Sequence, residues 1–172
     1  MMPVNIVYLS HGSRKYHDQT RFSVLTLLHL LLQQQRDDIR IVVYTDDASE
    51  VPQHPLIRAI VLQRAELAAF RGPFDYVHRI KLNVLRRASA ELEGPLLYVD
   101  CDTRWLHLPD NIFSRLRGDG GQAPLCCMHV AEGAFSPAFF PDYHRYVQQK
   151  QAQLQQLGIA DTSRLLMWNA GA

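Results

Sequence analysis

The stretch Pro95-Leu96-Leu97-Tyr98-Val99-Asp100-Cys101-Asp102 places two acidic residues directly behind a short apolar run. An apolar run of this length is typical of a buried strand in a parallel sheet. The side chains that follow such a strand lie at the carboxyl edge of the sheet, where open α/β folds bind their ligands. If the chain remains extended, Asp100 and Asp102 point to one side and Cys101 to the other. Two carboxylates held in this way suit Mg²⁺ or Mn²⁺ with water and phosphate oxygens as further ligands, whereas the plainer alternative is a solvated turn.

Strand patterns and helix patterns alternate on both sides of this stretch. Strands are expected at residues 5–10, 40–45, 57–62, 95–99, 124–130 and 165–169. Helices are expected at residues 18–35, 76–92, 111–116 and 142–157. This alternation predicts an α/β fold with a three-layer, mostly parallel, Rossmann-like sheet. Because Ser10, Asp46 and Asp47 also follow strands, they should meet Asp100 and Asp102 at one edge of that sheet.

Each helix is expected to bury one apolar side. In the first helix, the apolar residues at helical spacing are Phe22, Val24, Leu25, Leu28, Leu31 and Leu32. In the second helix they are Val77, Ile80, Val84, Leu85 and Ala88. Arg86 and Arg87 are expected on the solvated side of that helix, and Asp110 is expected to cap the third helix.

The composition is that of one ordinary globular domain. The chain has 172 residues, of which 47% are hydrophobic, and this is enough for a single core. A net charge of +1 argues against the basic surface of a nucleic-acid-binding protein. No apolar segment reaches membrane-spanning length, and residues 1–5 do not begin a secretory signal.

The cysteines favour a reducing compartment. Cys101, Cys126 and Cys127 are an odd number with two adjacent, which makes no disulfide framework, so a cytoplasmic location is expected. Cys126 and Cys127 are interpreted as core residues. The chain ends in an apolar segment and a turn, residues 166–172, with no covering helix after them. We therefore expect the domain to be incomplete at its C-terminus.

Several segments occur in an order that is familiar from one enzyme class. They are the first strand with its loop, Asn5 to Tyr16, the strand end Tyr44 to Asp47, the basic helix segment His78 to Lys81, the strand and acidic pair Leu97 to Asp102, and Met167 to Gly171. In this order they resemble the GT-A class of nucleotide-sugar glycosyltransferases, most closely the glycogenin/galactosyltransferase-like branch and its bacterial relatives. The resemblance implies a metal-dependent enzyme that moves a sugar from a nucleotide-diphosphate donor, a UDP-sugar in particular, to an unknown glycan, lipid or protein acceptor.

The resemblance also implies roles for individual residues. Asp102 would bind Mn²⁺ or Mg²⁺ directly, and Asp100 would bind the metal or the ribose. Positions implied in donor binding are Ser10, His11, Gly12, Lys15, Asp46, Asp47, Arg79, Lys81, Asn169, Ala170 and Gly171. No catalytic residue is implied. Relatives take a further metal ligand, a histidine, and the acceptor-binding part from segments beyond the position of Gly171.

Two other functions remain open at this point. One is a nucleotide-sugar-binding module or degenerate transferase without activity. The other is a phosphatase of the haloacid-dehalogenase type, in which the first aspartate is the nucleophile. That type normally carries its motif on the first strand and a Thr or Val two residues after the second aspartate, where this chain has Arg104.

The histidines show no zinc-ligand spacing. His11, His17, His78 and His129 are interpreted as loop or surface groups. His129, Glu132 and Gly133 should follow a strand at the same sheet edge, where acceptor contact and an ordinary loop are equally compatible with the pattern. Nothing near Cys101 marks it as a nucleophile.

Overall fold

The computed structural model describes residues 2–73, 75–118, 131–134, 145, 148–156 and 166–168. The chain divides into two compact units, residues 1–125 and 126–172. The expectation of a single domain stays a prediction, because two compact units can belong to one domain.

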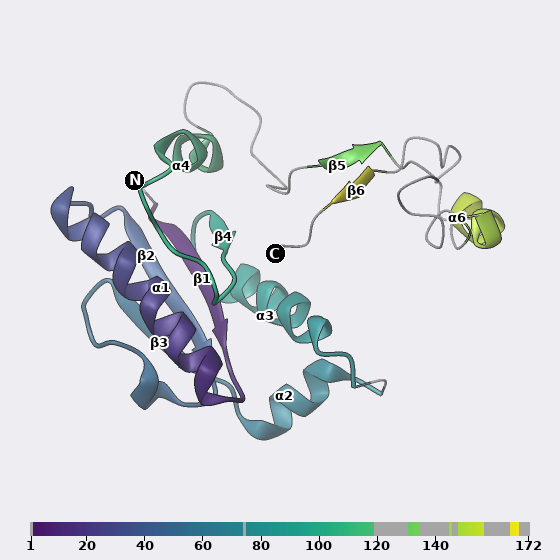
Figure 1. Cartoon of the computed structure of the whole chain (residues 1–172), viewed down its shortest axis with the longest axis horizontal. Helices are drawn as coiled ribbons and strands as arrows, with labels where there is room; N and C mark the ends of the chain where they lie inside the picture. Colours follow the sequence, from purple (N-terminus) through teal and green to yellow (C-terminus); the bar gives the residue numbers. More distant parts are fainter. Residues whose placement is uncertain are drawn as a thin grey trace. The chain divides into compact units, whose positions relative to one another are not determined.

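The first unit is built on an open sheet of parallel strands (Figure 1). Its strands are β1 (Val4–Ser10), β2 (Ile39–Thr45), β3 (Ile57–Val61) and β4 (Leu96–Tyr98). Their order is β3-β2-β1-β4, and β1 pairs with β2 along its whole length, from Val4 opposite Ile39 to Ser10 opposite Thr45. The predicted α/β class and parallel, Rossmann-like sheet are confirmed.

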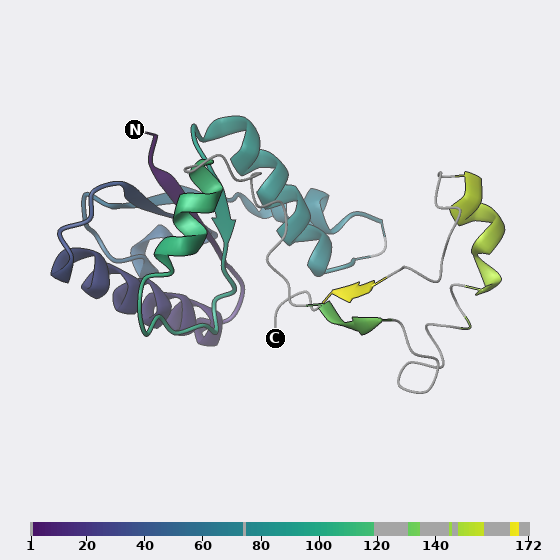
Figure 2. The ribbon, with the colours of Figure 1, turned by 90° about the horizontal axis from the view of Figure 1, so that it is seen from above.

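Helices cover both faces of this sheet (Figure 2). The helices of the first unit are α1 (Arg14–Gln33), α2 (Arg64–Arg71), α3 (His78–Glu91) and α4 (Asp110–Arg117), with a short 3-10 helix η1 (Ala48–Glu50) after β2. Successive residues of a strand point to opposite faces. Ile6 and Tyr8 of β1 therefore pack in one core with residues of α1 and α4, while Val7 and Leu9 pack in another with residues of α2 and α3. These two cores make the predicted three layers.

Most predicted elements lie within two residues of their observed bounds. Helix α6 (Gln151–Gln156) begins well after residue 142, where the last helix was expected. Two local features of the first unit also differ. Helix α2 was not predicted, although Gln63 and Glu66 form a capping box at its start, with the Gln63 N–H donating to Glu66 Oε2 over 2.8 Å. The prediction that Asp110 caps α4 is wrong. Asp110 is the first helical residue, the preceding Pro109 occupies the cap position, and no side chain caps this helix.

The buried side of α1 differs in part from the predicted one. Helix α1 begins at Arg14, four residues earlier than expected, and Phe22, Leu25 and Leu32 are 55%, 46% and 54% exposed. The residues that face the sheet are His17, Thr20, Ser23, Val24, Leu27 and Leu31. Val24 and Leu31 are buried and Leu28 packs against the core, as predicted. The apolar pattern misses His17, Thr20 and Ser23 because the first half of the buried side is polar. On α3, Ile80, Val84 and Ala88 are buried as predicted, whereas Val77 precedes the helix and is 50% exposed.

The second unit contains a two-stranded antiparallel sheet of β5 (Ala131–Ala134) and β6 (Leu166–Trp168), and helix α6 (Gln151–Gln156). Strand β6 confirms the predicted last strand. Glu132 and Gly133 lie within β5, so their interpretation as residues that follow a strand is wrong. The expected strand at residues 124–130, with Cys126, Cys127 and His129, lies outside the described residues. Among the helices that the structure describes, none has the length and apolar character needed to cross a membrane.

Candidate functional site

The strand order of the first unit places a topological switch point between β1 and β4. From β1, the chain adds β2 and β3 on one side of the sheet and then returns to add β4 on the other side. The direction of winding therefore changes between β1 and β4, and ligands of open parallel sheets bind outside the carboxyl ends of the strands at such a point. The loop after Ser10 and the loop after Tyr98 both begin there.

Asp100 forms an ion pair at this edge. Lys81 Nζ on α3 donates to Asp100 Oδ1 over 2.6 Å, and the two side chains are 32% and 15% exposed. The same ammonium group lies 5.9 Å from the centre of the Tyr98 ring. Lys81 therefore faces the carboxyl ends of the strands. Its positive charge offsets one of the two negative charges in the motif.

The motif itself is a turn and not an extension of the strand. Strand β4 ends at Tyr98, and the Thr103 hydroxyl donates to the Asp100 carbonyl oxygen over 2.8 Å. The prediction that the chain stays extended through Asp102 is therefore wrong, and strand alternation does not govern where these side chains point. Asp102 is exposed and makes no hydrogen bond or ion pair within the described part of the chain.

A series of linked hydrogen bonds between side chains, most of them hydroxyl groups, holds this turn in place. Trp105 Nε1 donates to the Tyr8 hydroxyl over 2.7 Å, Tyr8 and Ser23 are 3.0 Å apart, and Ser23 and Thr103 are 2.9 Å apart. Because Thr103 donates its single proton to the Asp100 carbonyl, Ser23 must donate to Thr103 and Tyr8 to Ser23. Burial raises the pKa of Tyr8 to about 12, so its proton remains in place. The network connects the turn to β1 and α1 and so fixes its position relative to the sheet.

Cys101, between the two aspartates, has no feature of a nucleophile. Burial and the neighbouring carboxylates of Asp102 and Asp100 raise the pKa of its thiol. The thiol donates to Gln19 Oε1 over 3.9 Å. A protonated and partly buried thiol agrees with the interpretation from the sequence.

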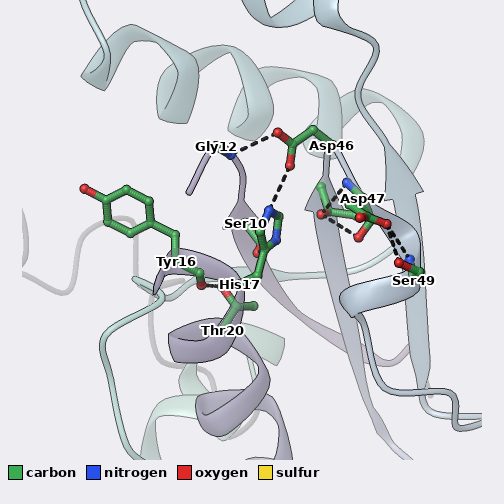
Figure 3. A network of polar contacts seen from close by, with 9 residues as sticks. Ser10, Gly12, Tyr16, His17, Thr20, Asp46, Asp47 and Ser49 are labelled. Atoms are coloured by element: carbon green, nitrogen blue, oxygen red, sulfur yellow. Dashed lines mark hydrogen bonds and ion pairs between the residues drawn. The ribbon is translucent and has the colours of Figure 1, made fainter. Parts of the chain in front are cut away.

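The loop after β1 is held by a second polar network, drawn in Figure 3. Ser10 Oγ lies 2.9 Å from His17 Nδ1, and His17 Nε2 lies 3.3 Å from Asp46 Oδ1. The Gly12 N–H donates to Asp46 Oδ2 over 2.9 Å. Since an ionised carboxylate only accepts, a neutral His17 carries its proton on Nε2, and Ser10 then donates to Nδ1. Gly12 has a φ of +91°, a conformation that glycine adopts most readily.

This network corrects one interpretation from the sequence. His17 is 7% exposed and is not a loop or surface group. The available signal was its spacing, because His17, Thr20, Val24, Leu27 and Leu31 follow one another at three and four residues and so share one side of α1.

Asp47, next to Asp46, caps η1. Its Oδ1 accepts from the Ser49 N–H over 2.9 Å and from the Ser49 hydroxyl over 2.6 Å. These hydrogen bonds from Ser49 hold the pKa of the Asp47 carboxyl below its usual value. Both acidic residues that follow β2 are thus occupied by contacts within the protein.

The remaining donor-site candidates are dispersed. Lys15 is exposed in the first turn of α1, and His11 is partly buried, which lowers its pKa despite the nearby Asp46. Arg79 lies two positions before Lys81, about 200° around α3. A Cβ at Gly72 would lie 1.5 Å from Arg79 Nη1, so this guanidinium packs against Gly72. Asn169, Ala170 and Gly171 lie outside the described residues.

The acidic motif is compatible with a divalent cation that prefers oxygen ligands, but the described residues do not supply a complete set of ligands. Within the ranges that the structure describes, no three His, Cys, Asp or Glu side chains come together around one point. Mg²⁺ and Mn²⁺ are commonly held by one or two carboxylates, with waters and phosphate oxygens in the other positions. Asp100 and Asp102 are two such carboxylates, two residues apart in the turn after β4.

Comparison of the chain with models of protein families finds no match, and comparison with curated proteins finds no significantly similar sequence. The assignment of a function therefore depends on the chemistry of this edge of the sheet.

Proposed function

We propose that the chain is a metal-dependent glycosyltransferase that binds a nucleotide-diphosphate sugar, a UDP-sugar in particular, at the carboxyl edge of β1 and β4. The observation that carries this proposal is the position of Asp100 and Asp102 at the point where the strand order reverses. Asp102 is exposed there, and Asp100 accepts from the Lys81 ammonium group and, among the described residues, from no backbone N–H group.

Charge explains why these residues suit a diphosphate. Two carboxylates alone would repel a diphosphate, whereas a divalent ion between them and the phosphates removes that repulsion. Breaking the bond between the sugar and the diphosphate adds negative charge to the leaving group, and a divalent ion supplies the compensating charge. Lys81 stands beside Asp100 and can donate to a phosphate oxygen once the ion neutralises the carboxylate.

The loop after β1 is the proposed nucleotide-binding element. Asp46 and His17 hold Gly12 and Ser10 in a fixed conformation, so the exposed backbone of this loop is ordered before a ligand arrives. In this proposal, Ser10, Asp46 and Asp47 act through the shape of the loop, because their polar groups already have partners. Lys15 is exposed at the start of α1 and is available for direct contact.

The experiment is a calorimetric titration of the protein with UDP and with a panel of nucleotide sugars. We expect binding with Mn²⁺ present and binding at least tenfold weaker in EDTA. Equal UDP affinity under both conditions would contradict metal dependence. Release of free UDP from one nucleotide sugar of the panel would support transferase chemistry, whereas tight binding without turnover would favour a sugar-nucleotide-binding module.

A further inference from the structure

A hollow lies at the amino edge of the same sheet, opposite the edge that carries Asp100. It has a volume of about 290 Å³, and its floor includes Asn5 of β1, Arg40 and Val42 of β2 and Arg58 of β3. Leu92, which follows α3, forms part of its wall. Small-molecule pockets typically measure about 300–1,000 Å³, so this hollow is at the lower end of that range.

At this end of the strands, the residues on one face of the sheet change from apolar to polar. On the face covered by α2 and α3, the middle of the sheet is apolar, with Val7, Val42 and Ile60 in the core. One alternation earlier in each strand, the same face carries Asn5, Arg40 and Arg58 instead. The Asn5 amide is buried and is used by the protein, since Nδ2 donates to the Glu93 carbonyl over 2.9 Å. The two arginines are exposed.

Among the described residues, no carboxylate contacts either of these two arginines. Neither guanidinium makes an ion pair or a hydrogen bond with any residue of the described ranges. In contrast, Arg36, Arg87 and Arg117 of the same unit are each paired with a carboxylate. Asp37 also lines the hollow, but it lies beyond ion-pair distance of both arginines.

The sheet geometry brings the arginines to one ligand. Ile41 pairs with Ile57, so Arg40 and Arg58 lie on adjacent strands and are offset by two residues. With strands about 4.8 Å apart and a rise of about 3.3 Å per residue, their Cα atoms are about 8 Å apart. Two guanidinium groups on long side chains can reach one oxyanion across that distance and donate in pairs to its oxygens.

We propose that this hollow is a second binding site, independent of the acidic motif, for a small molecule that carries a phosphate or carboxylate group. Arg40 and Arg58 hold the oxyanion, and Pro55, Leu56 and Leu92 offer an apolar surface to the rest of the molecule. Because the site lies at the amino edge of the strands, its ligand does not compete with a ligand at the Asp100 edge.

The test is an NMR titration of the ¹⁵N-labelled protein with inorganic pyrophosphate and, separately, with citrate. EDTA is present and the ionic strength is kept constant with sodium chloride, so that neither metal binding nor bulk charge contributes. We expect saturable shifts of the Arg40, Arg58 and Leu92 amides. Tighter binding of pyrophosphate would assign a phosphate ligand, and tighter binding of citrate would assign a carboxylate ligand.

Matched variants decide whether the site is specific. Arg40→Gln and Arg58→Gln should each weaken binding at least tenfold, whereas Arg64→Gln, an exposed arginine at the other edge, should change it less than twofold. Asp37→Asn should strengthen binding, because it removes a negative charge from the wall. Absence of saturable shifts at millimolar anion, or an equal loss in Arg64→Gln, would overturn the proposal.

Discussion

Two strands of the sheet, β2 and β4, are each followed closely by a pair of acidic residues, and the two pairs are used differently. After β2, Asp46 accepts from Gly12 and contacts His17, and Asp47 accepts twice from Ser49. After β4, Asp100 is paired only with Lys81, and Asp102 is exposed without a partner in the described part of the chain. The first pair holds loops together, while the second pair is available to a ligand.

Acidic residues at a strand end thus acquire their role from the groups around them. A carboxylate that accepts backbone N–H bonds already has its charge stabilised by the protein. An exposed carboxylate beside an ammonium group retains acceptor sites that a metal ion can use. The predictions below test this contrast between the two pairs.

The largest effect is expected for Lys81. Lys81→Ala should weaken the binding of UDP with Mn²⁺ more than tenfold, because a charge-assisted contact to phosphate contributes about 1.5–3 kcal/mol. The same variant should bind Mn²⁺ alone more tightly, because Asp100 loses its competing ammonium partner. Arg86→Ala, on the exposed side of α3, is the control for isothermal titration. Equal affinities of the two variants for UDP would refute the role of Lys81.

The next effect compares the stability contributed by one aspartate of each pair. Asp46→Ala should lower the free energy of unfolding by about 2 kcal/mol, because it leaves the Gly12 N–H and the His17 ring without an acceptor. Asp102→Ala should change it by less than about 0.5 kcal/mol, since the side chain is exposed. Urea unfolding of both variants measures the difference. A larger loss for Asp102→Ala would show that the second pair is structural.

The smallest effect concerns the titration of Asp47. Its folded-state pKa is depressed by Ser49, so its contribution to stability is present above the unfolded-state pKa and is lost as the pH falls through the folded-state value. Ser49→Ala removes one of the two hydrogen bonds and should raise the midpoint of the Asp47 carboxyl titration, followed by ¹³C NMR. An unchanged midpoint would show that the Ser49 hydroxyl does not stabilise the carboxylate.

The sequence predicts the strands and helices of this molecule better than it predicts the contacts of its polar side chains. The strands of the first unit have strong apolar patterns, and parallel pairing then brings Ser10, Asp46 and Asp100 to one edge. The pairing of Lys81 with Asp100 is a finding of the structure, because the sequence identifies no partner for this lysine. The distinction between the two acidic pairs is also a finding of the structure, because it depends on Ser49, Gly12 and the buried His17.

The turn at Asp100 is a second feature that the sequence alone does not predict. An extended strand through Asp102 and a turn after Tyr98 are compatible with the same residues. The choice is made by Thr103, which bonds the Asp100 carbonyl, and by the hydroxyl groups of Tyr8 and Ser23 that support Thr103. Residues so far apart in sequence leave no local pattern that would identify the network.

The most direct test of the central claim replaces one aspartate of each pair by asparagine and measures the binding of Mn²⁺ in the presence of UDP by electron paramagnetic resonance. Asp102→Asn and Asp47→Asn remove the same charge at the same edge of the sheet, and asparagine can still cap η1. We predict that Asp102→Asn loses Mn²⁺ affinity at least tenfold while Asp47→Asn stays within threefold of the unmodified protein. Retention of affinity in Asp102→Asn would contradict the assignment of the second pair as the metal–diphosphate site.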